Sequence, residues 1–274
     1  MLTYGLPVLF VLFLWWFSTG LVLYVIGLPL STRRRNMTVM TGLAALALAA
    51  LYATGDVMSV PAAYTAFTAA IIVWGWHEMS FLTGLVTGPR NDACPGRDGE
   101  PGCEPAPLGL AVESVIYHEA AIALTAALIW AITWGSANQV GLWTFVILWL
   151  MRLSAKLNVY LGVRNLTESF LPPHLEYLKT YFCRKPMNGF FPVAVTVSTV
   201  VAVALVMAAA DATTAFTATS LTFLATLMAL AVMEHWFLVI PLPADRLFSW
   251  GLTSRTAQAP DMAAKDDAIR MAAA

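Results

Sequence analysis

Each of the four histidines in this 274-residue chain has a carboxylate next to it or two residues away. Imidazoles and carboxylates together form the ligand sets of iron, manganese and zinc sites. An imidazole alone can also ligate the metal of a tetrapyrrole. Three of the pairs fall inside long apolar stretches, where such groups are rare. The pairs are His77–Glu78, His118–Glu119, His174–Glu176 and Glu234–His235.

The elements that must position these groups are membrane helices. Hydrophobic residues make up 59% of the chain and charged residues 11%, against about 25% charged in a soluble domain. A span needs about 20 apolar residues, and alternation at period two, typical of a membrane barrel, is absent. We therefore predict an all-α polytopic membrane helix bundle with about seven transmembrane helices. The predicted spans are roughly 5–30, 37–56, 61–86, 108–135, 139–160, 188–210 and 214–241.

Short-range signals support these boundaries. Ser59 is expected to cap the third span, with Pro61 in its first turn. Trp15 and Trp16 are expected to belong to the aromatic belt or to face lipid. Gly-rich phosphate loops and Gly-x-Ser-x-Gly elbows are absent, so nucleotide-driven chemistry is not expected. No nucleic-acid partner is expected either. Membrane lipids are expected as partners, because the spans must contact them.

The distribution of charge predicts the orientation. When loops are assigned to alternate sides of seven spans, all 15 lysines and arginines fall on one side. The other side holds only Asp56 and Asp211 among charged residues. Because basic loops stay in the cytoplasm, we predict a periplasmic N-terminus and a cytoplasmic C-terminus.

One domain is expected. Residues 1–250 form a single transmembrane helical domain, and 251–274 form a flexible cytoplasmic tail. Residues 88–107, rich in Gly, Pro, Asp and Glu, are expected to be a flexible cytoplasmic loop. Residues 161–187 include a short helix expected at the cytoplasmic interface. In that helix Leu175, Leu178 and Phe182 recur at helical spacing, opposite Lys179.

The depth of the ionisable residues predicts where they meet. At 1.5 Å per residue, His77 lies roughly 13 Å before the inner end of its span, and His118 lies at a similar depth. Glu234 and His235 lie roughly 9 Å from the inner end of the seventh span. An isolated charge at the bilayer centre costs on the order of 3 kcal/mol. These groups are therefore expected to face inward and converge near the cytoplasmic boundary.

Three occupants of such a site are compatible with the residues. The first is one or two ions of iron, manganese or zinc, although neither His-Glu-x-x-His nor Glu-x-x-His is present. The second is a tetrapyrrole, its magnesium or iron held by His77, His118 or His235 beside the rings of Trp76, Tyr117 and Trp236. The third is no ligand, with Arg152 and Lys156 balancing the carboxylates. The candidate metal ligands are His77, Glu78, Glu113, His118, Glu119, Glu234 and His235.

Four sequence blocks carry a resemblance to a known family. They are Trp76-His77-Glu78, Tyr117-His118-Glu119, residues 157–178 and residues 234–243, within a match over about 1–250. The chain resembles the PuhE-type photosynthetic-complex assembly proteins of purple bacteria. The matching positions of greatest interest are His77, Glu78, His118, Glu119, Asn158, Asn165, Glu168, His174, Glu234 and His235.

The resemblance implies an accessory factor of the bacterial inner membrane, either cytoplasmic or intracytoplasmic. Such a factor would help to assemble the reaction centre with its core light-harvesting antenna and bacteriochlorophyll. The implied partners are photosynthetic complex subunits and other assembly factors. The resemblance also brings Asn158 and His174 into the set of candidate cofactor-binding residues.

The leading prediction is an accessory protein that handles a tetrapyrrole and is not an enzyme. One alternative is a membrane-embedded metal-dependent oxidase acting on a tetrapyrrole or a lipid. Another is a scaffold that holds partner helices without any ligand. No residue is assigned a catalytic role.

Overall fold

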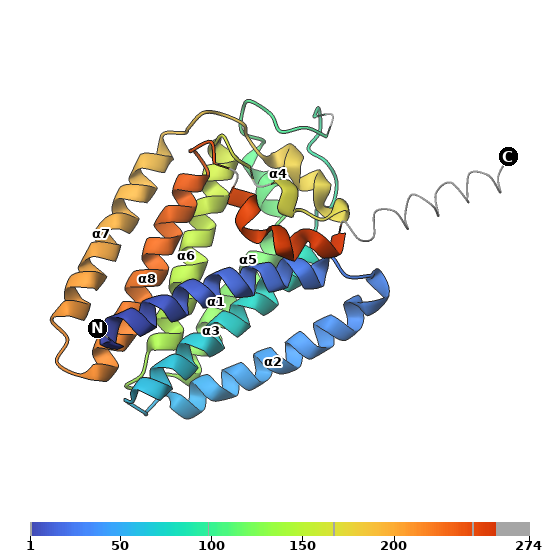
Figure 1. Ribbon diagram of the computed structural model, residues 1–274. Helices are drawn as coiled ribbons and strands as arrows, with labels where there is room; N and C mark the ends of the chain where they lie inside the picture. The colour runs from blue at the N-terminus through green and yellow to red at the C-terminus, as the bar shows by residue number, and fades with distance from the viewer. Residues whose placement is uncertain (1, 98, 167, 243, 256–274) are drawn as a thin grey trace.

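The computed structural model describes residues 2–97, 99–166, 168–242 and 244–255. Over these residues the chain is all-helical, with two isolated bridges and no strand. Figure 1 shows long helices side by side, with the connecting segments that include α4 gathered at one end. The α-helices are α1 Leu2–Ile26, α2 Arg33–Thr54, α3 Val60–Leu82, α4 Leu108–Glu113, α5 Ile116–Ile132, α6 Val140–Leu161, α7 Phe190–Ala210 and α8 Ala215–Phe237.

Five of these helices are long and apolar enough to cross a membrane: α1, α2, α6, α7 and α8. The chain is therefore a multi-pass helical membrane protein, as its composition predicts. Two further predicted spans correspond to α3 and to α4 with α5. The α3 helix carries His77 and Glu78 near its end, and α5 has only 17 residues. A count of seven spans stays a prediction.

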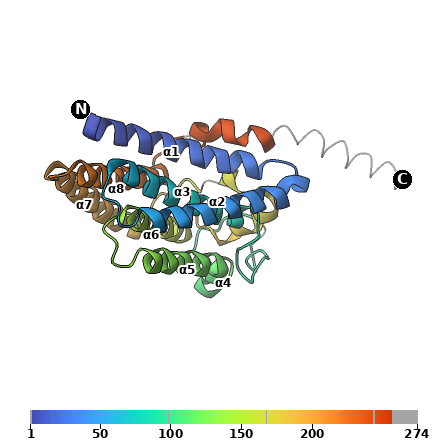
Figure 2. The ribbon, with the colours of Figure 1, turned by 90° about the horizontal axis from the view of Figure 1, so that it is seen from below.

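The helices form three tiers, and α6 lies in the middle tier, next to α5. The α2–α3 and α7–α8 pairs pack as neighbours, and α1 contacts both α3 and α8. The α6 helix contacts α3, α8, α5 and α7. Seen from below in Figure 2, α1 forms one outer tier and α4 and α5 form the other. Side chains on α6 are thus placed to meet groups from both sides of the bundle.

Helix starts follow the local sequence. The Ser59 hydroxyl accepts a hydrogen bond from the backbone N–H of Ala62 at 3.3 Å, with Pro61 in the first turn of α3. The predicted cap is confirmed. The Thr214 hydroxyl caps α8 in the same way, accepting from the Thr217 N–H at 3.0 Å. Both caps satisfy backbone donors that a helix cannot pair internally.

The predicted span 108–135 is not one helix but two, α4 and α5, with a break at residues 114–115. The backbone of the preceding loop docks at the break: the N–H of His118 donates to the carbonyl of Thr87 at 2.9 Å. A side chain at Gly88 would collide with the backbone of Glu113 to Val115. Glycine therefore permits the close approach that interrupts the helix.

The predicted loop and the predicted interfacial segment pack together at this end. Residues Pro173–Tyr181 form a 3₁₀ helix, η3, rather than an α-helix. Its Leu175 and Leu178 are buried against Phe81 and Leu82 at the end of α3. The 3₁₀ form accommodates this because residues three apart share a face. The segment is thus a cap on the bundle.

The loop 88–107, predicted to be flexible, is held to this cap by hydrogen bonds. Arg97 donates to the carbonyl of Thr180 at 2.8 Å, and the Tyr181 hydroxyl donates to the carbonyl of Asp92 at 2.8 Å. These bonds satisfy backbone carbonyls that would otherwise need water. Gly and Pro content predicts irregular backbone correctly but does not reveal such partners.

The chain after α8 returns across α1. A 3₁₀ helix, η4 (Ala244–Phe248), is followed by helical residues 249–255. The Ser254 hydroxyl donates to the carbonyl of Tyr24 at 2.8 Å, and Gly251 lies against Gly20. The packed part of the chain therefore reaches Arg255, into the predicted tail 251–274. The remainder of that tail lies outside the described residues.

Candidate binding cavity around α6

A cavity of about 660 Å³ surrounds the C-terminal half of α6. Its walls come from α1, α3, α4, α5 and α8, and from the cap. Most of the lining is apolar, for example Val11, Phe67 and Leu227. Pockets for large organic ligands fall in the range of about 300–1,000 Å³ and combine apolar walls with a few polar groups. The cavity has the volume and the walls of such a site.

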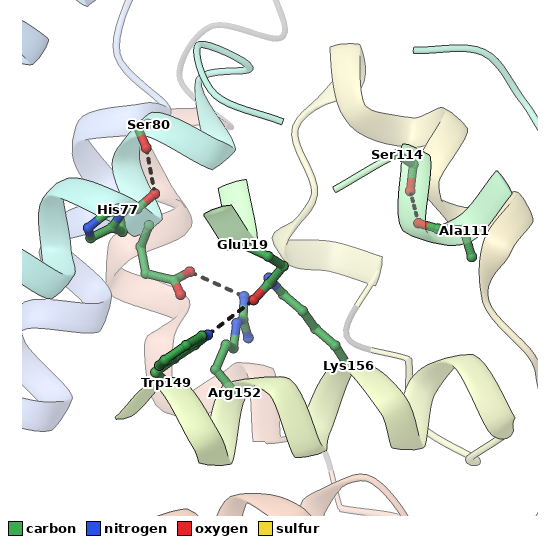
Figure 3. Close-up of polar contacts among 9 residues, drawn as sticks. His77, Ser80, Ala111, Ser114, Glu119, Trp149, Arg152 and Lys156 are labelled. Carbon is green, nitrogen blue, oxygen red and sulfur yellow. Dashed lines mark hydrogen bonds and ion pairs between the residues drawn. The ribbon is translucent and has the colours of Figure 1, made fainter. Parts of the chain in front are cut away.

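Two ion pairs cross the cavity from α6. Arg152 lies 3.2 Å from Glu78 of α3, and Lys156 lies 2.5 Å from Glu119 of α5. The indole N–H of Trp149 also donates to Glu119, at 3.2 Å. Figure 3 shows the Glu119 carboxylate between Trp149 and Lys156. Arg152 lies on α6 with these two residues. Arg152 and Lys156 thus balance two of the predicted carboxylates, and all four charged groups line the cavity.

Glu234 and His235 form a further polar group in the cavity lining. The indole N–H of Trp15 donates to Glu234 at 2.8 Å. His235 lies 2.9 Å from the carbonyl of Ala231 through Nδ1 and 2.9 Å from the Ser154 hydroxyl through Nε2. Because a carbonyl only accepts, we assign the ring proton to Nδ1. The Nε2 lone pair then accepts from Ser154.

His77 and His118 meet each other but do not line this cavity. Their ring centroids are 6.2 Å apart, and both residues are about 1% exposed. Phe145 packs on His77 and Phe81 packs on His118. Both ring nitrogens of His77 and Nδ1 of His118 have no hydrogen-bond partner among the described residues. The two rings form a sealed pair behind the cavity wall.

Several other predicted site residues have structural partners away from the cavity. The indole N–H of Trp76 donates to Thr41 at 2.9 Å. Asn158 accepts from the Asn188 amide through both its side-chain and its backbone oxygen, each at 3.1 Å. This contact joins the end of α6 to the start of α7.

Tyr117, Trp236 and Glu113 also point elsewhere. Tyr117 is 57% exposed and Trp236 is 43% exposed, the latter packing edge-on against Phe191. Glu113 pairs with Arg90 of the preceding loop at 3.2 Å. None of these three lines the cavity.

His174 lies at the end of α3, where it helps to cap the helix. It hydrogen-bonds the backbone carbonyls of Leu82 and Thr83, and Arg33 also donates to Thr83. Carbonyls at a helix C-terminus carry partial negative charge and favour such donors. Burial lowers the pKa of His174 from its usual value, and the charge of Arg33 lowers it further.

Sequence reasoning missed Trp15 and Ser154 as site residues. Trp15 was expected in an aromatic belt or facing lipid, and Ser154 drew no attention as a single hydroxyl in an apolar span. Both act through partners on α8, more than 80 residues away. A weak signal existed for Ser154 alone, because it lies on α6 between Arg152 and Lys156.

The structure brings only some of the predicted metal ligands close to one another. Within the described ranges, no group of three or more histidine, cysteine, aspartate or glutamate side chains is placed to hold a metal ion. Glu78, Glu113 and Glu119 are each engaged in an ion pair. His77 and His118 are near one another, while Glu234 and His235 belong to the cavity.

The cavity residues fit a metal-bearing tetrapyrrole better. A ligating histidine usually donates its second ring N–H to a carbonyl or carboxylate, and His235 has this arrangement with Ala231. The Ser154 hydroxyl can rotate away from Nε2. Apolar walls, one oriented imidazole and a few charged side chains are therefore present in one cavity.

Comparisons with known proteins give the family. A family described as "Protein of unknown function (DUF3623)" matches residues 1–259. A Rhodobacter capsulatus protein, described as an uncharacterized 30.4 kDa protein in the puhA 5′ region, is 39% identical over 248 residues, which is 89% of each chain. No solved structure matches the chain. Because the match spans nearly the whole chain, this protein belongs to the DUF3623 family.

Proposed function

We propose that this protein is an accessory factor for the assembly of the photosynthetic reaction centre with its light-harvesting antenna. In this role it holds bacteriochlorophyll or a related tetrapyrrole in the cavity around α6. The genomic setting of the Rhodobacter relative supports a role in photosynthesis, since its description refers to puhA, a photosynthetic reaction centre gene. The resemblance of the four sequence blocks to assembly proteins supports the same setting.

The observation that carries the proposal is the position of His235. It lines a 660 Å³ apolar cavity, and its Nδ1 is hydrogen-bonded to a backbone carbonyl. A tetrapyrrole bound here would supply a light-absorbing ring, and His235 would be the residue that holds its metal. The side chains of α1, α3 and α8 exclude water from its apolar faces.

Each polar residue has a part in this arrangement. Ala231 fixes the orientation of the His235 ring, and Ser154 is the partner of Nε2 when no ligand is present. Arg152 and Lys156 would hold polar groups of the ligand, because both line the cavity. Trp15 holds the Glu234 carboxylate in place. These residues bind and orient, and no bond is broken.

The proposed setting is the inner membrane, with seven spans and the α4-bearing end of the bundle in the cytoplasm. Arg33, Arg97 and Arg184 all make contacts at this end. The positive-inside preference therefore favours a cytoplasmic C-terminus. The cavity would then lie in the cytoplasmic leaflet, and the proposed partners are subunits of the photosynthetic complex.

Pigment binding by the purified protein tests the proposal. Bacteriochlorophyll a is titrated into the protein in phospholipid nanodiscs, and the shift of its near-infrared band is followed. The wild type should bind one pigment. His235→Leu should weaken binding by at least about tenfold, because a hydrogen bond or ligand bond of about 1.4 kcal/mol or more is lost.

His118→Leu is the matched control, since it removes a buried histidine that does not line the cavity. It should bind the pigment as the wild type does. A wild type that binds no pigment, or a loss confined to His118→Leu, would refute the proposed site.

The role in assembly is tested separately in phototrophic cells. Deleting the gene should lower the amount of reaction centre–antenna complex per unit of membrane protein. Wild-type protein and His118→Leu should restore it, whereas His235→Leu should not. Full restoration by His235→Leu would separate assembly from the cavity and favour a scaffold.

A further inference from the structure

We propose that the cavity is loaded sideways from the membrane, through an opening between α4–α5 and α6. This inference rests on the proposed function, because it concerns how the same cavity acquires its ligand. It adds a route of entry and the class of ligand source. That source is an apolar molecule dissolved in the lipid bilayer, rather than one delivered from water.

The exposure of the lining residues locates the opening. On α4 and the start of α5, Leu108, Val112 and Ile116 line the cavity yet are 60%, 42% and 40% exposed. On α6, Leu153 and Leu157 line the same cavity and are 43% and 38% exposed.

The apolar lining on the opposite side is buried. Phe67 of α3, Leu227 of α8 and Phe248 of η4 line the cavity and are buried. At the capped end Leu178 and Tyr181 are buried as well. The apolar exposure is thus concentrated on one flank of the cavity.

The exposed lining residues on α4, α5 and α6 form the rim of the opening, and their apolar character indicates whether the opening faces lipid or water. The rim is made of five aliphatic side chains on α4, the start of α5 and α6, on the flank of the bundle beside the end where the loops gather. An aliphatic rim exposed to water would be unfavourable, whereas lipid tails are as apolar as leucine. Figure 2 places α4 and α5 in an outer tier, next to α6.

The break between α4 and α5 shapes the opening. The loop backbone at Thr87 and Gly88 docks at this break, so α4 is a separate six-residue helix rather than a continuation of α5. Just inside the rim, the Lys156–Glu119 pair presents charge to an entering ligand. A molecule with a polar edge would therefore pass the aliphatic rim and then meet these two groups.

The rate of loading tests the route. Protein in nanodiscs is mixed with vesicles of phosphatidylcholine containing bacteriochlorophyll a, and the band shift is followed over time. Val112→Trp and Leu153→Trp should each slow loading about tenfold, the effect of a modest rise in the activation barrier, with the final amount bound less affected. Val112→Ala, which widens the rim, should speed loading.

Leu124→Trp is the control, because Leu124 is exposed on α5 and does not line the cavity. It should load at the wild-type rate. Unchanged rates in Val112→Trp, Leu153→Trp and Val112→Ala, with normal final binding, would overturn the route but leave the proposed function standing. No binding by the wild type would overturn both.

Discussion

The sealed histidine pair and the cavity around α6 lie close together but have opposite character. His77 and His118 face each other with three ring nitrogens unpartnered and no share in the cavity lining. His235 lines the cavity and has partners on both nitrogens. Two histidines that look alike in the sequence thus occupy a packed core, and the third is presented to a space large enough for a ligand.

The depth of a residue in a span therefore does not reveal the direction in which its side chain points. All three histidines lie at similar predicted depths, and each has a neighbouring carboxylate. What separates them is the helix face on which each lies and what packs there. A neutral imidazole surrounded by aromatic rings can be tolerated in a core, whereas a cavity retains polar groups that can serve a ligand.

The largest effect should come from breaking an ion pair of the cavity. Lys156→Met leaves Glu119 without its cation, and both side chains are less than a quarter exposed. Removing one partner of a buried pair costs about 3 kcal/mol. The free energy of unfolding in detergent micelles, measured by titration with sodium dodecyl sulfate, should fall accordingly.

A double variant sharpens that prediction. Lys156→Met combined with Glu119→Gln removes the uncompensated charge and should recover most of the lost stability. Equal losses in the single and double variants would mean that the pair is not coupled as the 2.5 Å contact implies.

Replacing a histidine of the sealed pair should raise the unfolding stability rather than lower it. His77→Leu removes two buried ring nitrogens that lack partners, each a group whose burial costs about 1–3 kcal/mol. We expect unfolding stability to rise by about 1 kcal/mol, without loss of pigment binding. A marked loss of stability, or of a bound metal in elemental analysis, would instead indicate that something binds between His77 and His118.

A loss of stability smaller than that of Lys156→Met is expected at the α1 side of the cavity. Trp15→Phe keeps the aromatic ring but removes the 2.8 Å bond to Glu234. A hydrogen bond to a charged group contributes about 1.5–3 kcal/mol, so the loss should lie near the lower figure. Trp16→Phe is a useful comparison, because its indole donates to the backbone carbonyl of Leu247 instead. Equal losses in the two variants would argue against a charged acceptor.

The smallest effect is a dependence on pH at the end of α3. Because burial and Arg33 lower the pKa of His174 in the folded state, the unfolded chain binds more protons below about pH 6.5. This contribution to stability is present above that pH and decreases as the pH falls towards the folded pKa. His174→Gln should therefore flatten the profile of unfolding stability against pH. A profile as steep as that of the wild type would show that His174 does not titrate this way.

Composition and turn chemistry predict most of the fold. The Ser59 cap is confirmed, and the helical bundle with long apolar segments follows from residue content. The break between α4 and α5 could not be predicted, because it depends on a loop backbone docking beside Gly88. Local sequence around Glu113 to Ile116 contains no proline that would announce it.

The site is predicted less completely than the fold. Glu78, Glu119, Glu234 and His235 do line one cavity, as their depth suggests. Trp76 and Asn158 were grouped with them by neighbourhood or resemblance, yet they stabilise contacts between helices. Which face a residue occupies depends on helix rotation, and hydropathy is nearly uniform around these spans, so it gives no direction.

Photo-crosslinking tests most directly whether the ligand occupies the cavity rather than the region of the sealed pair. The photoreactive residue p-benzoylphenylalanine replaces either Phe67, which lines the cavity, or Phe145, which packs on His77 outside it. After loading with bacteriochlorophyll a and illumination, mass spectrometry measures the pigment attached at each position. We predict attachment at position 67 and none at position 145; attachment only at position 145 would contradict the assignment of the cavity as the binding site.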